Sequence, residues 1–459
     1  MLKRSENPAS AGVKRSENPD LPGEELKKKL NKPQPVRGMH DRLPEEMRRL
    51  EKVILIIKNV FKKYGFEQIE TPALEYWEFL SGKDRYGEEE KLIYRFKDRG
   101  GREVGLRYDF TVPLARVMAT YTDITLPFKR FQIQQVWRGD SPQYGRFREF
   151  YQCDADIVGS NSMIAEAECI SINYEIFSLL GFKEFKIRIN NRKILQSLCN
   201  YCQIEPDIQL QVFRAMDKVE RIGIDGVAEK LELHNVPVEK RKKLIDILQD
   251  CKQISDLKKV LKNEPGVTEI IEIFRLLSYL NVPQKDYCFD IWMARGLDYY
   301  TGPIFETAVK KPKIGSLASG GRFDKLVEAF KPGHIMPATG ISIGLERVLV
   351  AMKELDLCPT PDTYVKVLVA IFDPSHIEQT MQIAYKIRNC GIQTEVYAQP
   401  DKINTQFKYA DKRKIPFVII VGPDEVKNKC FTIKNMATGK QQAKKMSDLI
   451  IWAKSILDK

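Results

Sequence analysis

The segment FQIQQVWRGDSPQYGRFREFYQCDADIV, residues 131–158, indicates the fold of the chain. Apolar and polar residues alternate over much of 131–136 and 149–157, and this period of two is typical of strands. The polar residues between the two runs are typical of a loop. Because successive strands joined by a short connection pair antiparallel, the segment predicts a β-hairpin in an antiparallel sheet.

The sequence on either side of this hairpin supports the same kind of sheet. Residues 45–64 carry apolar side chains at helical spacing, and Gly65 ends the predicted helix. Alternating or short apolar runs predict further strands at 66–72, 94–97, 103–107, 288–293, 305–309 and 339–343. This run of strands favours an α+β domain with an antiparallel sheet over a βαβ arrangement.

Three other regions differ in pattern. Residues 195–285 are helix-patterned, rich in Lys and Glu and poor in glycine, which predicts a helical insertion between two parts of the sheet. Residues 363–459 follow a Pro- and Thr-containing linker and predict a separate α/β domain. Its strands are expected at 365–371, 393–397 and 417–421, and its helices at 376–388 and 405–412. Residues 1–36 are polar and contain the hexapeptide KRSENP twice, which predicts a disordered tail.

Composition narrows the classes of function. The formal net charge of the 459 residues is +12, and residues 363–459 contribute seven of these charges, with sixteen Lys and Arg against nine Asp and Glu. This excess favours a polyanionic partner such as a nucleic acid, although a solubilised surface has the same composition. No run of about 18 apolar residues and no apolar N-terminal signal is present, so we expect no membrane span and a cytoplasmic location.

The nine cysteines form no framework-like array, which favours a reducing compartment. Cys199 and Cys202 resemble half of a zinc site, but a structural zinc ion needs four ligands and no second close pair of Cys or His exists. Residues 194–204 are predicted to form a helix in which these thiols pack. We therefore expect no zinc.

The loop of the hairpin concentrates three arginines, Arg138, Arg146 and Arg148, beside Phe150. Guanidinium groups match phosphate and carboxylate oxygens, and an aromatic ring stacks on flat rings. The combination indicates a nucleoside triphosphate site or, alternatively, an RNA contact. A charged hairpin with a packed Phe would have the same residues.

Three further segments place charged or polar side chains beside glycine. In 339–347, small residues alternate with apolar ones before Arg347 at a predicted helix start, so a flat ligand could approach the backbone. The segment ARGLDYYTG, 294–302, joins an Arg and an Asp to two tyrosines, whose hydroxyls suit a pocket. The segment SGGRFD, 319–324, is predicted as a glycine turn.

In this order the segments resemble the three motifs of the class II aminoacyl-tRNA synthetases. The helix ending at Gly65 with the strand after it resembles motif 1, a dimer-interface element of that class. Motif 2 is similar to residues 138–150, and motif 3 is similar to residues 340–347. Segments that resemble ones specific to the histidyl-tRNA synthetases are RGMHD at 37–41, RGLDYYT at 295–301 and GGRFD at 320–324.

The resemblance implies an enzyme that activates L-histidine with ATP and then transfers it from histidyl-adenylate to the 3′ end of tRNA(His). Arg138 would hold the α-phosphate and the histidine carboxylate, and Arg295 would approach the α-phosphate from the other side; these are the expected catalytic residues. Arg146 and Arg347 would bind the γ-phosphate side, and Phe150 would stack on adenine. ATP would act as substrate with Mg²⁺, whose ligands the sequence leaves open.

The resemblance also implies a histidine pocket. Its expected members are Asp109, Phe110, Thr111, Arg138, Gln152, Asp156, Arg295, Tyr299 and Tyr300. Four of them would surround the α-ammonium: Asp109, Thr111, Gln152 and Tyr299. Asp156 and Tyr300 would hydrogen-bond the two imidazole nitrogens. Because a wrong side chain would leave these groups unpaired, such a pocket rejects it strongly.

Three residues depart from the family pattern. Phe323 stands where tyrosine is common, Asp140 where the class motif usually has Glu, and Ser342 where motif 3 usually has glycine. None of these changes removes an arginine expected at the phosphates. They bear on the histidine contacts more than on the reaction.

Other readings explain the residues less completely. A regulatory subunit of ATP phosphoribosyltransferase resembles this fold, but such subunits typically lack a C-terminal α/β domain and often lose residues of the Arg295 type. A synthetase for threonine or proline would not carry 295–301. An RNA-binding protein would account for the basic C-terminal region but not for the arginines of the hairpin.

The resemblance assigns roles to the predicted regions and implies a homodimer. Residues 1–36 would be a disordered tail, 37–194 and 286–357 the two parts of the catalytic domain, 195–285 a helical insertion, and 363–459 an anticodon-binding domain.

Overall fold

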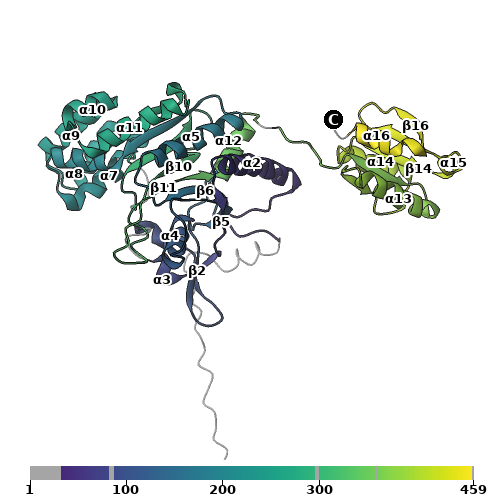
Figure 1. Cartoon of the computed structure of the whole chain (residues 1–459), viewed down its shortest axis with the longest axis horizontal. Coiled ribbons are helices and arrows are strands. Elements are labelled where there is room, and N and C mark those ends of the chain that lie inside the picture. Colours follow the sequence, from purple (N-terminus) through teal and green to yellow (C-terminus); the bar gives the residue numbers. More distant parts are fainter. Residues whose placement is uncertain (1–32, 82–86, 295–298, 358, 457–459) are drawn as a thin grey trace, which may run out of the picture. The chain divides into compact units, whose positions relative to one another are not determined.

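The computed structural model describes residues 33–81, 87–294, 299–357 and 359–456 (Figure 1). The first described segment, 33–41, has a turn at 37–38. The duplicated hexapeptide lies outside the described residues. The remaining chain contains three sheets.

The largest sheet has eight strands in the order β1-β5-β6-β11-β10-β9-β7-β8. Its strands are β1 (Glu67–Gln68), β5 (Phe128–Trp137), β6 (Glu149–Val158), β7 (Phe185–Asn191), β8 (Tyr287–Phe289), β9 (Pro303–Val309), β10 (Ala318–Arg322) and β11 (Ala338–Gly344). β1 pairs parallel with β5, and β8 pairs parallel with β7. All other pairs in this sheet are antiparallel, so the predicted α+β fold with an antiparallel sheet is confirmed.

Alternation along β6 gives the sheet two different faces. Cys153, Ala155 and Ile157 are buried in the apolar core that includes α2 (Pro44–Lys63) and α5 (Ile164–Leu179). In Figure 1 these two helices and α12 (Leu345–Glu354) gather beside β6 and β11. The even-numbered residues of β6 point to the other face, because successive side chains of a strand alternate.

A second, three-stranded sheet has the order β2-β4-β3. Its strands and neighbouring helices are β2 (Leu74–Tyr76), β3 (Arg95–Lys97), β4 (Glu103–Leu106), α3 (Trp77–Leu80), the short helix Gly87–Leu92 and α4 (Thr111–Thr120). β3 and β4 form the predicted antiparallel hairpin.

Residues 192–279 are helical, as expected. The helices are α6 (Arg192–Tyr201), α7 (Gln209–Met216), α8 (Val219–Leu233), α9 (Val238–Asp250), α10 (Ile254–Leu261) and α11 (Pro265–Tyr279). Their apolar faces are buried, for example Leu244 and Leu248 of α9, while Lys and Glu lie on the exposed faces.

The C-terminal part has a five-stranded sheet of its own, in the order β13-β12-β14-β15-β16. Its elements are β12 (Val367–Ile371), α13 (Ile377–Arg388), β13 (Thr394–Val396), α14 (Ile403–Lys412), β14 (Phe417–Val421), α15 (Pro423–Lys427), β15 (Cys430–Asn435), β16 (Gln441–Lys445) and α16 (Leu449–Ser455). The parallel β–α–β core matches the expectation. Two antiparallel strands, β15 and β16, extend it beyond what the sequence predicted.

Three predictions of elements were wrong in detail. The expected glycine turn at 319–324 is largely the strand β10, because Gly320 and Gly321 sit in the middle of the sheet, where neighbouring backbone and rings leave no room for side chains. The strand expected at 66–72 pairs only at 67–68, and that at 288–293 pairs only at 287–289. Among the described helices, none has both the length and the apolar character needed to cross a membrane.

Candidate active site

Three even-numbered residues of β6 build one wall of a cavity: Gln152, Asp154 and Asp156. We call this the amino acid cavity; its other lining residues are Asp109, Thr111, Arg138, Tyr299, Tyr300, Ser319, Gly320, Phe323, Gly340, Ile341 and Ser342. These residues come from segments up to about 230 positions apart, between Asp109 and Ser342. The sheet brings them together because β6 and β11 lie side by side at its centre.

The pair Arg130 and Asp156 lies across neighbouring strands in this wall. Arg130 on β5 stands opposite Asp156, and an Nη2–Oδ2 distance of 2.5 Å joins two side chains that are 0% and 5% exposed. Arg130 also donates to the carbonyl oxygen of Phe110 at 3.3 Å. On the other flank, Gly340 stands opposite Asp156, and a Cβ there would lie 1.9 Å from Asp156 Oδ1. Glycine at 340 is therefore required by the position of the carboxylate.

The two buried carboxyls of β6 differ in charge state. Burial raises the pKa of Asp154 to about 8, and the neighbouring negative charge of Asp156 adds to this shift. Burial also raises the pKa of Asp156, to about 6, but Arg130 opposes that shift. At neutral pH Asp156 is therefore mainly ionised, whereas Asp154 mainly carries a proton.

Asp109 and the tyrosines close the opposite side of the amino acid cavity. Asp109 Oδ1 accepts hydrogen bonds from the backbone N–H groups of Thr111 and Val112, at 3.1 and 3.2 Å, at the start of α4. The Tyr299 hydroxyl donates to Thr111 Oγ1 at 3.5 Å, and its ring centroid lies 4.9 Å from that of Tyr300. Burial raises the pKa of both tyrosines, so both hydroxyls stay protonated and can donate.

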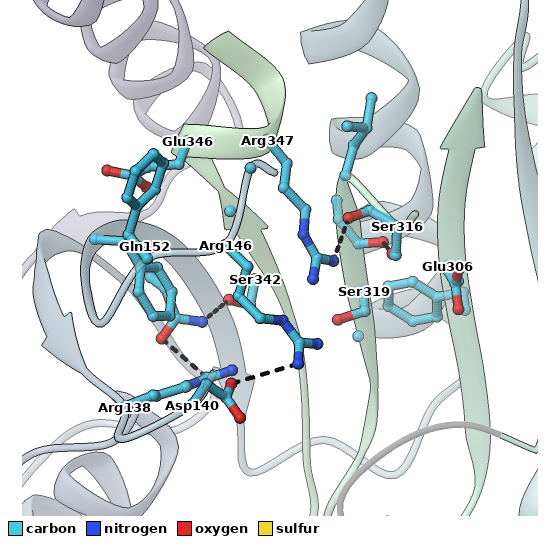
Figure 2. Close-up of a pocket in the computed structure, with 18 of the residues that line it drawn as sticks. Arg138, Asp140, Arg146, Gln152, Glu306, Ser316, Ser319, Ser342, Glu346 and Arg347 are labelled. Carbon is cyan, nitrogen blue, oxygen red and sulfur yellow. Dashed lines mark hydrogen bonds and ion pairs between the residues drawn. The ribbon is translucent and has the colours of Figure 1, made fainter. Parts of the chain in front are cut away.

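A second, larger cavity of about 990 Å³ adjoins the first (Figure 2). We call it the nucleotide cavity. Arg146, on the hairpin loop, and Arg347, in α12, point their guanidinium groups into it from two sides. Arg146 Nη1 lies 3.6 Å from Asp140 Oδ2, and Arg347 Nη1 donates to the carbonyl oxygen of Ser316 at 2.9 Å. The two cations suit the phosphates of a nucleoside triphosphate.

Arg138 lies at the junction and lines both cavities. Its Nε donates to the carbonyl oxygen of Tyr108 at 3.1 Å, and its Nη2 donates to Gln152 Oε1 at 3.4 Å. Its guanidinium lies 4.2 Å from the ring centroid of Tyr108 and 5.1 Å from that of Phe150. These contacts hold the guanidinium near two aromatic rings at the junction of the two cavities.

The structure gathers most of the residues singled out from the sequence. Phe150, Arg146 and Arg347 line the nucleotide cavity, and Asp109, Thr111, Asp156 and Tyr299 line the amino acid cavity. Gln152 and Tyr300, like Arg138, line both. Phe110 lines neither cavity; its ring is fully buried. Arg148 donates from Nε to the carbonyl oxygen of Asp140 at 3.1 Å and also lines neither. Arg295 lies outside the described residues.

The three departures from the family pattern lie in these cavities. Phe323 lines the amino acid cavity with a ring centroid 6.0 Å from that of Tyr299 and brings no hydroxyl. Asp140 is the partner of Arg146. Ser342 accepts a hydrogen bond of 2.6 Å from Gln152 Nε2.

Sequence reasoning missed three acidic residues of the cavities, Asp154, Glu306 and Glu346. Asp154 follows Gln152 by two positions, so the alternation of β6 was a sufficient signal to place it beside Asp156. Glu306 is 3% exposed and lines the nucleotide cavity from β9. Its strand was predicted, but nothing local indicated which face would meet the nucleotide cavity.

Cys199 lies on α6 and Cys202 caps the C-terminal end of that helix; both are buried, as predicted. Burial raises the pKa of the Cys199 thiol to about 12, so it holds its proton, and a thiol binds zinc only after losing it. Within the described ranges, no group of three or more His, Cys, Asp or Glu side chains could hold a metal ion.

Comparison with known proteins places these features in one family. A family model described as histidyl-tRNA synthetase matches residues 38–348, and one described as anticodon binding domain matches residues 366–456. The histidine–tRNA ligase of Clostridium tetani is 39% identical over 93% of this chain and 99% of its own length; that of Gloeobacter violaceus is 37% identical over 88% and 95%. The crystal structure of histidyl-tRNA synthetase from Nostoc sp. has 31% identity and a TM-score of 0.80, over 92% of this chain and 99% of that one.

Proposed function

The chain belongs to the histidyl-tRNA synthetase family, and from this premise we propose how its two cavities work together. The activity, shared with the family, is the ligation of histidine to tRNA. We place ATP in the nucleotide cavity and L-histidine in the amino acid cavity. The observation that carries this placement is Arg138, which lines both.

The first step needs alignment more than a protein nucleophile. The histidine carboxylate is ionised at neutral pH and attacks the α-phosphorus of ATP; a new O–P bond forms, and pyrophosphate leaves with the electrons of the broken P–O bond. Arg138 is placed to hold the carboxylate and the α-phosphate at once, which converts the encounter into a nearly unimolecular step. Arg146 and Arg347 would bind the β- and γ-phosphates and stabilise the charge on pyrophosphate. Phe150 would stack on adenine.

Arg295 is assigned to the α-phosphate by the family resemblance alone, opposite Arg138. Two guanidinium groups on one phosphate would share the charge that builds up in the transition state. The residue lies in 295–298, outside the described residues, so this role stands as a proposal tested by substitution.

Histidine would be recognised at both of its ends. Asp109, Thr111, Gln152 and Tyr299 would surround the α-ammonium. Asp156, held ionised by Arg130, would accept from the imidazole N–H, and the protonated hydroxyl of Tyr300 would donate to the other nitrogen. Since Asp156 is buried, an amino acid without a ring donor would leave it unpaired, which costs about 1–3 kcal/mol or more for a charged group.

Magnesium would accompany ATP. Mg²⁺ binds through one or two carboxylates together with substrate phosphates and waters. The acidic residues that line the nucleotide cavity are Asp140, Glu306 and Glu346. Carboxylates among these three would hold the ion, whose chemistry would be to neutralise phosphate charge. That the chain needs no zinc stays a prediction.

The remaining assignments follow the same premise. We propose a catalytic domain from 37–194 and 286–357, a helical insertion at 195–285 and an anticodon-binding domain at 363–459, supported by the anticodon-binding family match at 366–456. We also propose that two copies associate through the motif 1 region, that tRNA(His) is the acceptor, and that the enzyme acts in the cytoplasm. Sedimentation should then give twice the chain mass of 53.0 kDa.

ATP–pyrophosphate exchange with each of the twenty amino acids tests the site assignment. We expect exchange with histidine alone, followed by charging of tRNA(His). Exchange that histidine does not stimulate, or that another amino acid stimulates more, would contradict the placement of histidine in the amino acid cavity.

A further inference from the structure

Asp154 has a buried polar atom that the proposed contacts leave without a partner. Its side chain is 3% exposed, and its Oδ1 has no hydrogen-bond partner in the described parts of the chain. The residue nevertheless lines the amino acid cavity. Buried polar atoms are nearly always paired, so an unpaired one facing a ligand cavity points to an atom of the ligand.

A cross-strand neighbour fixes the orientation of this carboxyl. Ser342 on β11 stands directly opposite Asp154 on β6, and its hydroxyl lowers the pKa of the Asp154 carboxyl by hydrogen bonding. The Ser342 hydroxyl accepts from Gln152 Nε2 at 2.6 Å, which directs its single proton toward Asp154. Gln152 in turn accepts from Arg138 Nη2 at 3.4 Å. Polar contacts therefore run from the arginine between the cavities to the Asp154 carboxyl, whose Oδ1 has no partner in the described parts of the chain.

Resting on the proposed function, we infer that Asp154 is a specificity-determining residue whose Oδ1 contacts the imidazole ring of histidine, and that Ser342 positions it. A glycine at 342 could not make this hydrogen bond. The pair Asp154 and Ser342 thus adds a contact to those implied by the family resemblance.

The charges around Asp154 decide what Oδ1 offers to the ring. The titratable or charged groups that line the cavity or face Asp154 are Asp156 on β6, Arg130 on β5, Arg138 after β5, Asp109 before α4, and Tyr299 and Tyr300 before β9. Burial, with the charge of Asp156, raises the pKa of Asp154 to about 8, so its carboxyl carries a proton at neutral pH and can donate. Neutral imidazole has one acceptor nitrogen and one N–H. The acceptor nitrogen has one lone pair, which Asp154 and the Tyr300 hydroxyl would share as donors, while ionised Asp156 accepts from the N–H.

Steady-state exchange kinetics of three variants test this inference. Asp154→Ala should raise KM for histidine about 10- to 100-fold, because Oδ1 and the ring nitrogen both lose a partner. KM for ATP should change less than about twofold, since Asp154 does not line the nucleotide cavity. Ser342→Ala should raise KM for histidine less than Asp154→Ala does. Cys153→Ala is the matched control: Cys153 is the preceding residue of β6, faces the core, and should leave KM for histidine unchanged.

Asp154→Asn separates recognition from a purely structural role. Its amide keeps a donor but cannot ionise, so at pH 7 KM for histidine should stay within about threefold of wild type. Between pH 7 and 9 wild-type Asp154 passes through its pKa of about 8 and loses its proton. KM for histidine of the wild type should then rise relative to that of Asp154→Asn. Both enzymes meet the same substrate at each pH, so the ratio of their KM values cancels the titration of histidine itself.

The outcomes are distinguishable. An unchanged KM for histidine in Asp154→Ala, or a loss confined to thermal stability, overturns the inference while histidine-dependent exchange by the wild type upholds the proposed function. A ratio of the two KM values that stays constant from pH 7 to 9 overturns the donor role. If the wild-type enzyme shows no histidine-dependent exchange, the proposed function itself is refuted. That result does not depend on any of the variants.

Discussion

Substituting Gly340 with alanine should disable the amino acid cavity and destabilise the domain. An added Cβ would lie 1.9 Å from Asp156 Oδ1 and 2.9 Å from the carbonyl oxygen of Ala155. Carbon and oxygen in contact are about 3.3 Å apart, so the carboxylate would have to move by roughly 1 Å or more. Asp156 Oδ2 lies 2.5 Å from Arg130 Nη2. Moving the carboxylate by roughly 1 Å would break this ion pair.

The size of the effect follows from the burial of Arg130. A buried ion pair that loses one partner costs about 3–5 kcal/mol. Because Asp156 is displaced and not removed, we take the lower end, about 3 kcal/mol, which corresponds to a fall in Tm of roughly 6–12 °C for a domain of 150–250 residues. KM for histidine should rise at least about 100-fold, because the acceptor for the imidazole N–H is misplaced.

Calorimetry and ATP–pyrophosphate exchange measure the two effects. Gly344→Ala is the control for stability, because it lies on the same strand and a Cβ there meets no atom within 4 Å. In the background of Asp156→Ala, Gly340→Ala should cost less stability than in the wild type, since the clashing carboxylate is gone and only the 2.9 Å contact with the carbonyl oxygen of Ala155 remains. A Gly340→Ala enzyme with the wild-type Tm and KM for histidine would refute the position given to Asp156.

Three further outcomes are expected. Arg295→Ala should nearly abolish histidine-dependent exchange while the circular dichroism of the fold persists; unchanged exchange would remove its proposed role. Deleting residues 363–459 should spoil tRNA charging far more than exchange, and an equal loss of both would argue against anticodon binding by that domain. Arg347→Ala should raise KM for ATP about 10- to 100-fold with little change in KM for histidine, and Arg347→Lys should not restore it, because an ammonium lacks the planar fork; full rescue by lysine would contradict a forked contact to phosphate.

Local patterns were sufficient for the hairpin and the helical region. The period of two at 131–136 and 149–157 corresponds to β5 and β6, and the period near 3.6 at 45–64 corresponds to α2, because each pattern is set by residues close in sequence. The glycines at 320–321 led to a wrong prediction of a turn, because that prediction also used only residues close in sequence. Glycine is typical of turns, and only the strands on both sides of β10 show that its missing side chains serve close packing.

The chemistry of single residues could also be inferred early. Arg138 and Arg347 were assigned to phosphates because guanidinium groups suit oxyanions wherever they occur. Phe110 shows the limit of that approach. It was expected in the histidine pocket, but its ring is buried and its carbonyl oxygen holds Arg130 instead.

By itself the sequence determined which elements form and which side chains carry charge toward a ligand, since periodicity and functional groups are properties of short segments. Only the tertiary structure decided the register that sets Arg130 against Asp156 and Asp154 against Ser342. Register depends on hydrogen bonds between strands that are far apart in the chain, and on which strand faces the core. The charge state of Asp154, which comes from burial beside Asp156, could be established only once those strands were paired.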